Sequence, residues 1–225
     1  MTTLRIPIMP LSNSEHIPAV LHFAQACRPR SILDVGIGTG SYGLLLRQSL
    51  DIGYGRIQKS EWEVTIDGVE LFEPYRNPVW DFAYNRVLPG DIRDLLPGLG
   101  SYDLILCNDV LEHFPRAEAR ALVTTLLQHG RVLLATTPNR EFPQGAWGGN
   151  EAERHHCLLG RDDFAGLVAE VVTGITSCFV CTRHEDLVYP LLLAADRCPS
   201  IVAARPLHPW VRLRRKWRQW RLRHP

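Results

Sequence analysis

Short apolar runs alternate along the chain with segments in which apolar residues recur every three to four positions. Such runs have the length of buried strands, and such periodic segments are typical of helices with one buried face. Strands are expected at 31–36, 64–71, 86–88, 103–108, 131–137, 175–182 and 187–194. Helices are expected at 15–26, 42–50, after the Glu73-Pro74 pair, at 116–128, and from Asp162-Asp163 to 172.

This alternation predicts an α/β fold, a doubly wound and mostly parallel sheet of seven strands with helices on both faces. The last two strand-like runs are separated only by 183–186, which allows a hairpin and is too short for a parallel crossover. One antiparallel strand is therefore expected near the C-terminal end of the sheet. Pro190 inside the last run favours an edge position there.

The first strand ends in a glycine-rich turn that indicates a bound cofactor. Glycine stands at positions 36, 38 and 40, directly before the helix expected at 42–50. Without a Cβ the backbone can turn sharply and approach a ligand closely, and a helix N-terminus offers unpaired N–H groups to an anion. Residues 38–43 also fit the dinucleotide fingerprint, so an NAD or nucleotide-sugar enzyme is an alternative.

Asp34, inside this strand, favours a different cofactor. A strand covered on both faces is normally apolar throughout, and a buried carboxylate is costly without a partner. S-adenosylmethionine carries an amino group that can pair with Asp34 directly or through water, whereas NAD offers no ammonium there. The stretch 31–43 resembles motif I of the class I S-adenosylmethionine-dependent methyltransferases, and the chain resembles their small-molecule branch.

That resemblance covers about residues 30–140, and its second strong match is Asp-Val-Leu-Glu-His at 109–113. It implies a seven-stranded sheet whose strands hold the cofactor at their carboxyl ends. It also implies that Glu70 accepts the ribose hydroxyls and that Asp91 contacts the adenine amino group. Glu73 is the alternative acid, and capping of a helix at 92–96 is the alternative role of Asp91. The implied cofactor residues are Asp34, Gly36, Gly38, Gly40, Glu70, Leu71, Asp91, Ile92, Asn108, Asp109 and His113, with S-adenosylhomocysteine as the product.

Methyl transfer to a hydroxyl group needs a base, and histidine is the usual base near neutral pH. His155 and His156 lie in a long polar segment, 138–160, and such segments in compact domains are often functional. We expect His155 to be the catalytic base, with His156 as the second choice; surface histidines without a role are the alternative. A His155-His156-Cys157 metal site lacks spaced partners, so no metal site is expected.

The bulk composition predicts one globular domain, and the resemblance implies that it is a methyltransferase domain at 1–204, with 1–28 as a helical cap. The chain has 225 residues, of which 45% are hydrophobic and 22% charged. Its six cysteines lie mostly in apolar stretches, and neither a signal peptide nor a long apolar run is evident, which favours a cytoplasmic protein with reduced thiols. The polar connection 51–63 is expected to be a variable loop.

Residues 205–225 form a basic tail with seven arginines, one lysine and no acid, so the remaining chain has a net charge of −7. On a helix, the tryptophans and leucine at 210, 213, 217 and 220 would share one face. We expect this helix to dock on the acidic body or to join a homodimer. Contact with an anionic membrane surface and nucleic-acid binding are the alternatives.

The sequence therefore predicts an enzyme that methylates a small-molecule acceptor, with a hydroxyl oxygen as the favoured site. An RNA methyltransferase that uses the basic tail is one alternative. A cofactor-binding scaffold without catalysis is another.

Overall fold

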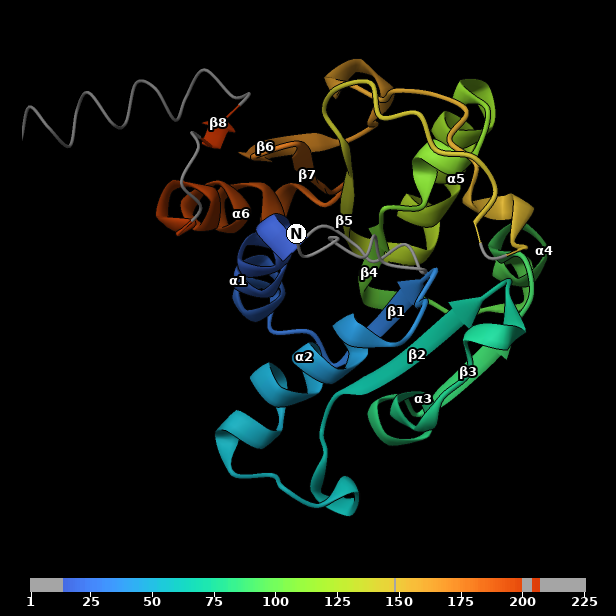
Figure 1. Ribbon diagram of the computed structural model, residues 1–225. Helices are drawn as coiled ribbons and strands as arrows, with labels where there is room; N and C mark the ends of the chain where they lie inside the picture. Colours follow the sequence, from blue (N-terminus) through green and yellow to red (C-terminus); the bar gives the residue numbers. More distant parts are fainter. Residues whose placement is uncertain (1–13, 148, 200–203, 207–225) are drawn as a thin grey trace, which may run out of the picture.

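A computed structural model describes residues 14–147, 149–199 and 204–206 as strands, helices and connections around one sheet (Figure 1). The strand order in the sheet is β3-β2-β1-β4-β5-β7-β6-β8. Strands β1 to β5 pair in parallel, and β7 is antiparallel to both of its neighbours, β5 and β6. The strands are β1 (Ser31–Val35), β2 (Thr65–Glu70), β3 (Arg86–Pro89), β4 (Tyr102–Asn108), β5 (Gly130–Pro138), β6 (Leu167–Thr173), β7 (Thr176–Cys181) and β8 (Ala204–Pro206).

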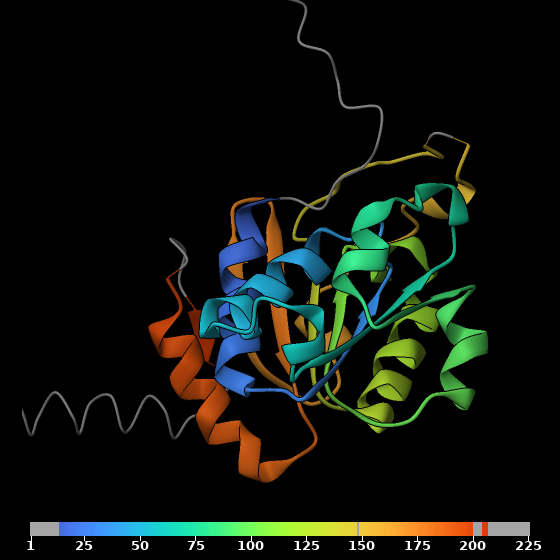
Figure 2. The same cartoon turned by 90° about the horizontal axis from the view of Figure 1, so that it is seen from below.

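Helices cover both faces of this sheet (Figure 2). The α-helices are α1 (Ile17–Cys27), α2 (Ser41–Leu50), α3 (Pro78–Ala83), α4 (Ile92–Leu95), α5 (Arg116–His129) and α6 (Glu185–Arg197). Single 3-10 turns are η1 (Ser14–His16), η2 (Ile52–Tyr54), η3 (Lys59–Glu61), η4 (Glu73–Tyr75), η5 (Leu96–Gly98), η6 (Leu111–His113), η7 (Glu151–Glu153) and η8 (Arg161–Asp163). The predicted doubly wound, mostly parallel fold with an antiparallel strand near its end is confirmed.

The core lies in two layers because successive strand residues point to opposite faces of the sheet. Ile32 and Leu104 pack with α1, α2, α3 and α6, whereas Leu33 and Ile105 pack with α4 and α5. The central strands are therefore apolar on both faces, as parallel strands with helical cover are. Polar side chains of functional interest consequently gather where the strands end.

Two of the predicted elements were wrong. The segment expected to be a helix from Asp162-Asp163 forms only the single turn η8, and β6 follows it. Strand β6 contains three valines and joins β7 through a tight turn at Gly174, which has a φ of 59°. The hairpin exists, but it joins β6 to β7.

The run 187–194, expected to be a strand, belongs to helix α6. Its Leu-Leu-Leu-Ala-Ala sequence favours a helix, and Leu191, Leu192, Ala194 and Ala195 are buried in the layer that also contains α1. Pro190 is accommodated inside this helix rather than at a sheet edge.

Strand β8 was not predicted, and it pairs antiparallel with β6. Two residues of the basic tail, Arg205 and Pro206, lie in it. The rest of the tail, 207–225, and residues 1–13 of the cap fall outside the described residues, so the tail helix and the domain division remain predictions. Among the described helices, none has the length and apolar character required to cross a lipid bilayer.

Candidate active site

A cavity of about 880 Å³ opens where β1, β2 and β4 end. Ten of the thirteen residues that the sequence indicated line it, and the structure therefore brings together segments far apart in the chain. These ten are Gly36, Gly38, Glu70, Leu71, Asp91, Ile92, Asn108, Asp109, His113 and His155. Asp34, Gly40 and His156 are not among the residues that line it.

The glycine turn after β1 requires glycine for its backbone geometry. Gly36, Gly38 and Gly40 have φ angles of 70°, 51° and 87°, in the left-handed region that disfavours side chains. A Cβ at Gly36 would lie 2.4 Å from the Val110 Cγ2 atom, whereas at Gly38 it would meet no atom within 4 Å. Gly38 thus presents bare backbone to the cavity, and Gly40 begins α2 as its N-cap.

Glu70, the last residue of β2, is held against this turn. Its carboxylate accepts hydrogen bonds from the backbone N–H of Gly38, at 2.7 Å, and from that of Phe72, at 2.8 Å. Only 6% of the residue is exposed, and burial raises the pKa of its carboxyl group. Each carboxylate oxygen has a second lone pair, so Glu70 can still accept hydrogen bonds from a ligand in the cavity.

Asp34 has a protein partner that the sequence did not reveal. The Tyr84 hydroxyl donates a hydrogen bond to its carboxylate at 2.6 Å and accepts one from the Gly43 N–H at 3.1 Å. Asp34 is 2% exposed and does not line the cavity. The pairing that we expected from a cofactor amino group is therefore made inside the protein, and burial raises the pKa of Asp34 to about 7.

We expect Asp34→Asn to remove a pH dependence of stability. Because the pKa of Asp34 is higher in the folded chain than its unfolded value near 4, its contribution to stability is complete below about pH 4 and is lost as pH rises through about 7. Between pH 5 and pH 8 the free energy of unfolding of the unmodified chain should fall by on the order of 2 kcal/mol relative to that of the variant. Urea unfolding of both proteins at each pH measures this difference, and a constant difference would contradict it.

Asp91 both lines the cavity and caps α4. Its carboxylate accepts a hydrogen bond from the Arg93 N–H at 2.8 Å and pairs with the Arg93 guanidinium at 2.6 Å. The guanidinium of Arg93 lowers the pKa of Asp91, which keeps the carboxylate ionised. Ile92, which follows it, is 4% exposed and adds an apolar surface to the same side. A carboxylate beside an apolar surface suits the amino group and ring of a nucleobase.

The end of β4 places two polar side chains at the cavity. Neither polar atom of the Asn108 side chain has a hydrogen-bond partner in the described part of the chain, although the residue is only 4% exposed. Asp109 has a left-handed φ of 53°, and its carboxylate accepts a hydrogen bond from Thr136 Oγ1 at 3.0 Å and lies 3.5 Å from the buried His16 ring. Buried groups normally have partners, so Asn108 fits a polar ligand such as a nucleoside cofactor.

The two histidines expected as bases differ in position. The His155 Nδ1 atom lies 2.7 Å from the Phe142 carbonyl oxygen, so Nδ1–H donates to it and Nε2 keeps a lone pair. The ring stands 5.0 Å from that of His113, and burial followed by the charge of His113 lowers the pKa of His155. His156 is exposed and does not line the cavity. Of the two expected bases, only His155 faces this site.

Two glutamates at the cavity were not among the expected site residues. Glu112, in η6, is 1% exposed, and burial raises the pKa of its carboxyl group well above its usual value. Glu153, in η7, accepts a hydrogen bond from the Tyr75 hydroxyl at 2.9 Å, and its Oε2 atom lies 3.9 Å from His113 Nε2. The Asp-Val-Leu-Glu-His motif contained a signal for Glu112, whereas nothing local distinguished Glu153 from a surface residue.

Comparisons with known proteins agree with this geometry. Residues 13–171 match a family model described as a methyltransferase domain. No curated protein matches the chain significantly.

Among solved structures, three illustrate the likeness in fold. An O-methyltransferase family protein from Burkholderia thailandensis has 17% identity and a TM-score of 0.53, over 76% of this chain and 56% of that one. Magnesium protoporphyrin IX methyltransferase from Synechocystis with bound S-adenosylmethionine has 17% identity and a TM-score of 0.51, over 75% of this chain and 76% of that one. The N-terminal domain of EvdMO1, with S-adenosylhomocysteine and D-fucose, has 18% identity and a TM-score of 0.50, over 76% of this chain and 85% of that one.

Proposed function

Because the chain belongs to the S-adenosylmethionine-dependent methyltransferase family, we propose that its acceptor is a hydroxyl group of a small molecule. The observation that carries this proposal is the position of His155. Its Nε2 lone pair is free while Nδ1 is fixed by the Phe142 carbonyl group, and the ring lines the cavity. A neutral imidazole in that position can take a proton from an acceptor.

The cofactor supplies an activated methyl group on a positively charged sulfur. Gly36 and Gly38 can cradle its amino-acid part, since no side chain there obstructs close approach. Glu70 can accept the ribose hydroxyls, while Asp91 and Ile92 flank the position of an adenine ring. Asn108 offers unpaired polar atoms to the cavity at the end of β4.

The acceptor half of the cavity is built from η6 and from the segment that follows β5. Glu112 and His113 come from η6, and Phe142, Glu153 and His155 come from the later segment. This mixture of an apolar ring, carboxylates and imidazoles suits a small hydroxylated acceptor. Holding that acceptor beside the methyl carbon provides much of the rate enhancement, because the displacement requires in-line alignment.

We expect His155→Gln to lower kcat by about 10² to 10⁴-fold, the usual contribution of a positioned base. His156→Gln, at the exposed neighbouring position, should change kcat less than about twofold. Formation of S-adenosylhomocysteine with a panel of small phenols, sugars and hydroxy acids measures both. Equal losses in the two variants, or a panel in which only amines are methylated, would contradict the proposal.

A further inference from the structure

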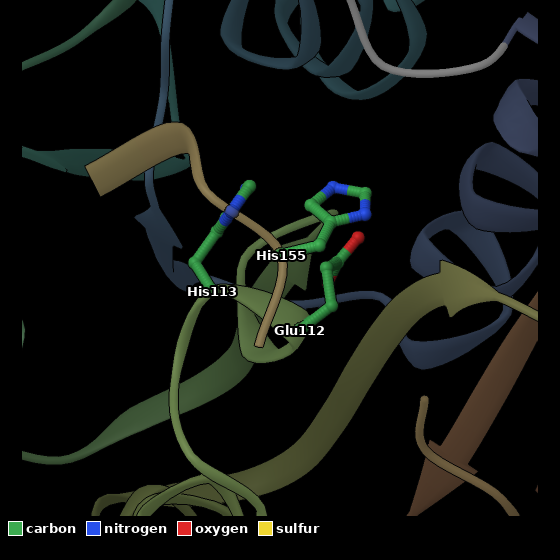
Figure 3. A group of neighbouring side chains, drawn as sticks. All are labelled: Glu112, His113 and His155. Carbon is green, nitrogen blue, oxygen red and sulfur yellow. The ribbon is translucent and has the colours of Figure 1, made fainter. Parts of the chain in front are cut away.

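Three side chains on the acceptor side of the cavity form a compact set of metal-ligand atoms. One ligand atom from each of Glu112, His113 and His155 lies within 4.8 Å of the other two. Glu112 and His113 follow β4, and His155 comes from the connection between β5 and β6, so the fold brings them together (Figure 3).

Glu112 indicates that this set binds a ligand. The residue is 1% exposed, and its Oε2 atom has no hydrogen-bond partner within the described residues. A buried carboxylate oxygen without a partner is costly, and native proteins rarely retain one without a use for it. Figure 3 shows the Glu112 carboxylate and the His155 ring directed toward each other.

Each histidine has a lone pair that can serve a metal ion. Donation from Nδ1–H of His155 to the Phe142 carbonyl oxygen fixes the ring with Nε2 free, which is the arrangement found in metal-binding histidines. The two ring nitrogens of His113 lie 3.3 Å and 3.1 Å from the carbonyl oxygens of Arg154 and Asp109. A neutral imidazole can donate to only one of them, and the lone pair of its other nitrogen faces a carbonyl oxygen, so the His113 ring has to turn for that lone pair to reach a cation.

We propose that Glu112, His113 and His155 bind a divalent transition-metal cation. Two imidazoles and one carboxylate suit Mn²⁺, Fe²⁺ or Zn²⁺, whereas Mg²⁺ and Ca²⁺ prefer sets made of oxygen atoms. Bonds of about 2.1 Å place neighbouring ligand atoms of one ion about 3.0 to 3.4 Å apart. The three atoms, which lie within 4.8 Å of one another, therefore have to move closer by as much as about 1.5 Å when the cation binds. All three residues line the cavity, so an acceptor bound there can reach the cation.

The role of the cation, unlike its binding, rests on the proposed function. An acceptor hydroxyl bound to the cation would be acidified and, with His155 acting as a ligand, would lose its proton to solvent in the cavity. The hydroxyl oxygen then bonds to the methyl carbon as the bond between that carbon and sulfur breaks, leaving its electron pair on sulfur. Without the cation, His155 takes the proton itself.

Titration of the chelator-treated, full-length chain with Mn²⁺ alone, followed by electron paramagnetic resonance, tests the binding. We expect one Mn²⁺ per chain, and at least tenfold weaker binding in Glu112→Gln and in His155→Ala. His184→Ala is the matched control, because His184 is exposed and follows the end of β7 that lies toward the start of β5, whereas the cavity lies where the parallel strands end. That variant should bind Mn²⁺ as the unmodified chain does.

Absence of Mn²⁺ binding at millimolar concentration, or unchanged affinity in the His155→Ala variant, would overturn the proposal. His155→Ala decides the question even if Glu112→Gln fails to fold, because His155 is half-buried in a connecting segment. Binding of S-adenosylmethionine to the metal-free chain is measured in parallel by calorimetry. Failure of the cofactor to bind would count against the proposed function while leaving the Mn²⁺ result to stand independently.

Discussion

Replacing Glu70 by alanine should weaken S-adenosylmethionine binding by about 100-fold. The carboxylate is fixed by the N–H groups of Gly38 and Phe72, and two of its lone pairs remain to accept the ribose hydroxyls. Hydrogen bonds to a charged group contribute about 1.5 to 3 kcal/mol each, so losing two corresponds to at least this factor. Isothermal titration calorimetry measures the change directly.

The matched control for this loss is Glu73→Ala. Glu73 is the alternative acid, three residues further along the chain, but it is exposed and does not line the cavity. Its removal should leave the dissociation constant within about twofold of the original. Glu70→Gln should be intermediate, because the amide oxygen still accepts one N–H while the charge is lost. Loss of binding in Glu73→Ala with binding intact in Glu70→Ala would reverse the assignment.

Most of the fold around the cofactor cavity could be predicted because its signals are local. The apolar run before Gly36 predicts a strand from local sequence alone. The parallel pairing of β1 with β2 and β4 then places the carboxyl ends of these three strands side by side. Glu70 and Asn108 stand at those ends, so their proximity follows from the topology. The cofactor was predicted from the resemblance of 31–43 to motif I and from the need of Asp34 for a partner, and in the structure Tyr84 is that partner.

The errors in the fold arose where local signals are ambiguous. A short apolar run with β-branched residues can be a strand or part of a helix, and only its tertiary partner decides. Leu167–Thr173 becomes a strand because β7 provides a paired edge. The Leu-rich run before Arg197 becomes a helix because α1 offers an apolar face. Neither partner can be identified from the neighbouring sequence.

Long-range contacts also explain what was missed in the site. His16 approaches Asp109 from the N-terminal end of the described chain, and Glu153 reaches Tyr75 across the cavity. A histidine before a helix or a glutamate in a polar loop has no local feature that reveals such a contact. Glu112 was visible as part of a motif, but its burial depends on the surrounding fold.

The connection 51–63 was expected to be a variable polar loop, yet its first residue is fully buried. Asp51 pairs with Arg47 of α2, which is also 0% exposed, and it accepts hydrogen bonds from Arg56 and the Glu63 N–H. The Arg47 guanidinium also donates to the Val64 and Ala83 carbonyl oxygens and lies 4.0 Å from the centre of the Trp62 ring. This buried pair therefore ties the connection to α2 and to the start of β2.

Arg47→Ala should consequently lower the free energy of unfolding by about 3 to 5 kcal/mol, because it leaves the Asp51 carboxylate buried without its main partner. For a chain of this size the melting temperature should fall by roughly 10 °C. Arg56→Ala removes a second partner of the same carboxylate, but one whose side chain is 24% exposed, and it should cost less than half as much. Thermal and urea unfolding measure both variants.

A double variant separates the ion pair from the packing of the two side chains. In the double variant Arg47→Met with Asp51→Leu, the buried ion pair is replaced by two apolar side chains. We therefore expect it to lose less free energy of unfolding than the single variants Arg47→Met and Asp51→Leu lose together. The coupling free energy is the difference between that sum and the loss in the double variant, and we expect it to exceed about 1 kcal/mol. Strictly additive losses would mean that solvent reaches Asp51 and that the connection is held by the aromatic contact with Trp62 instead.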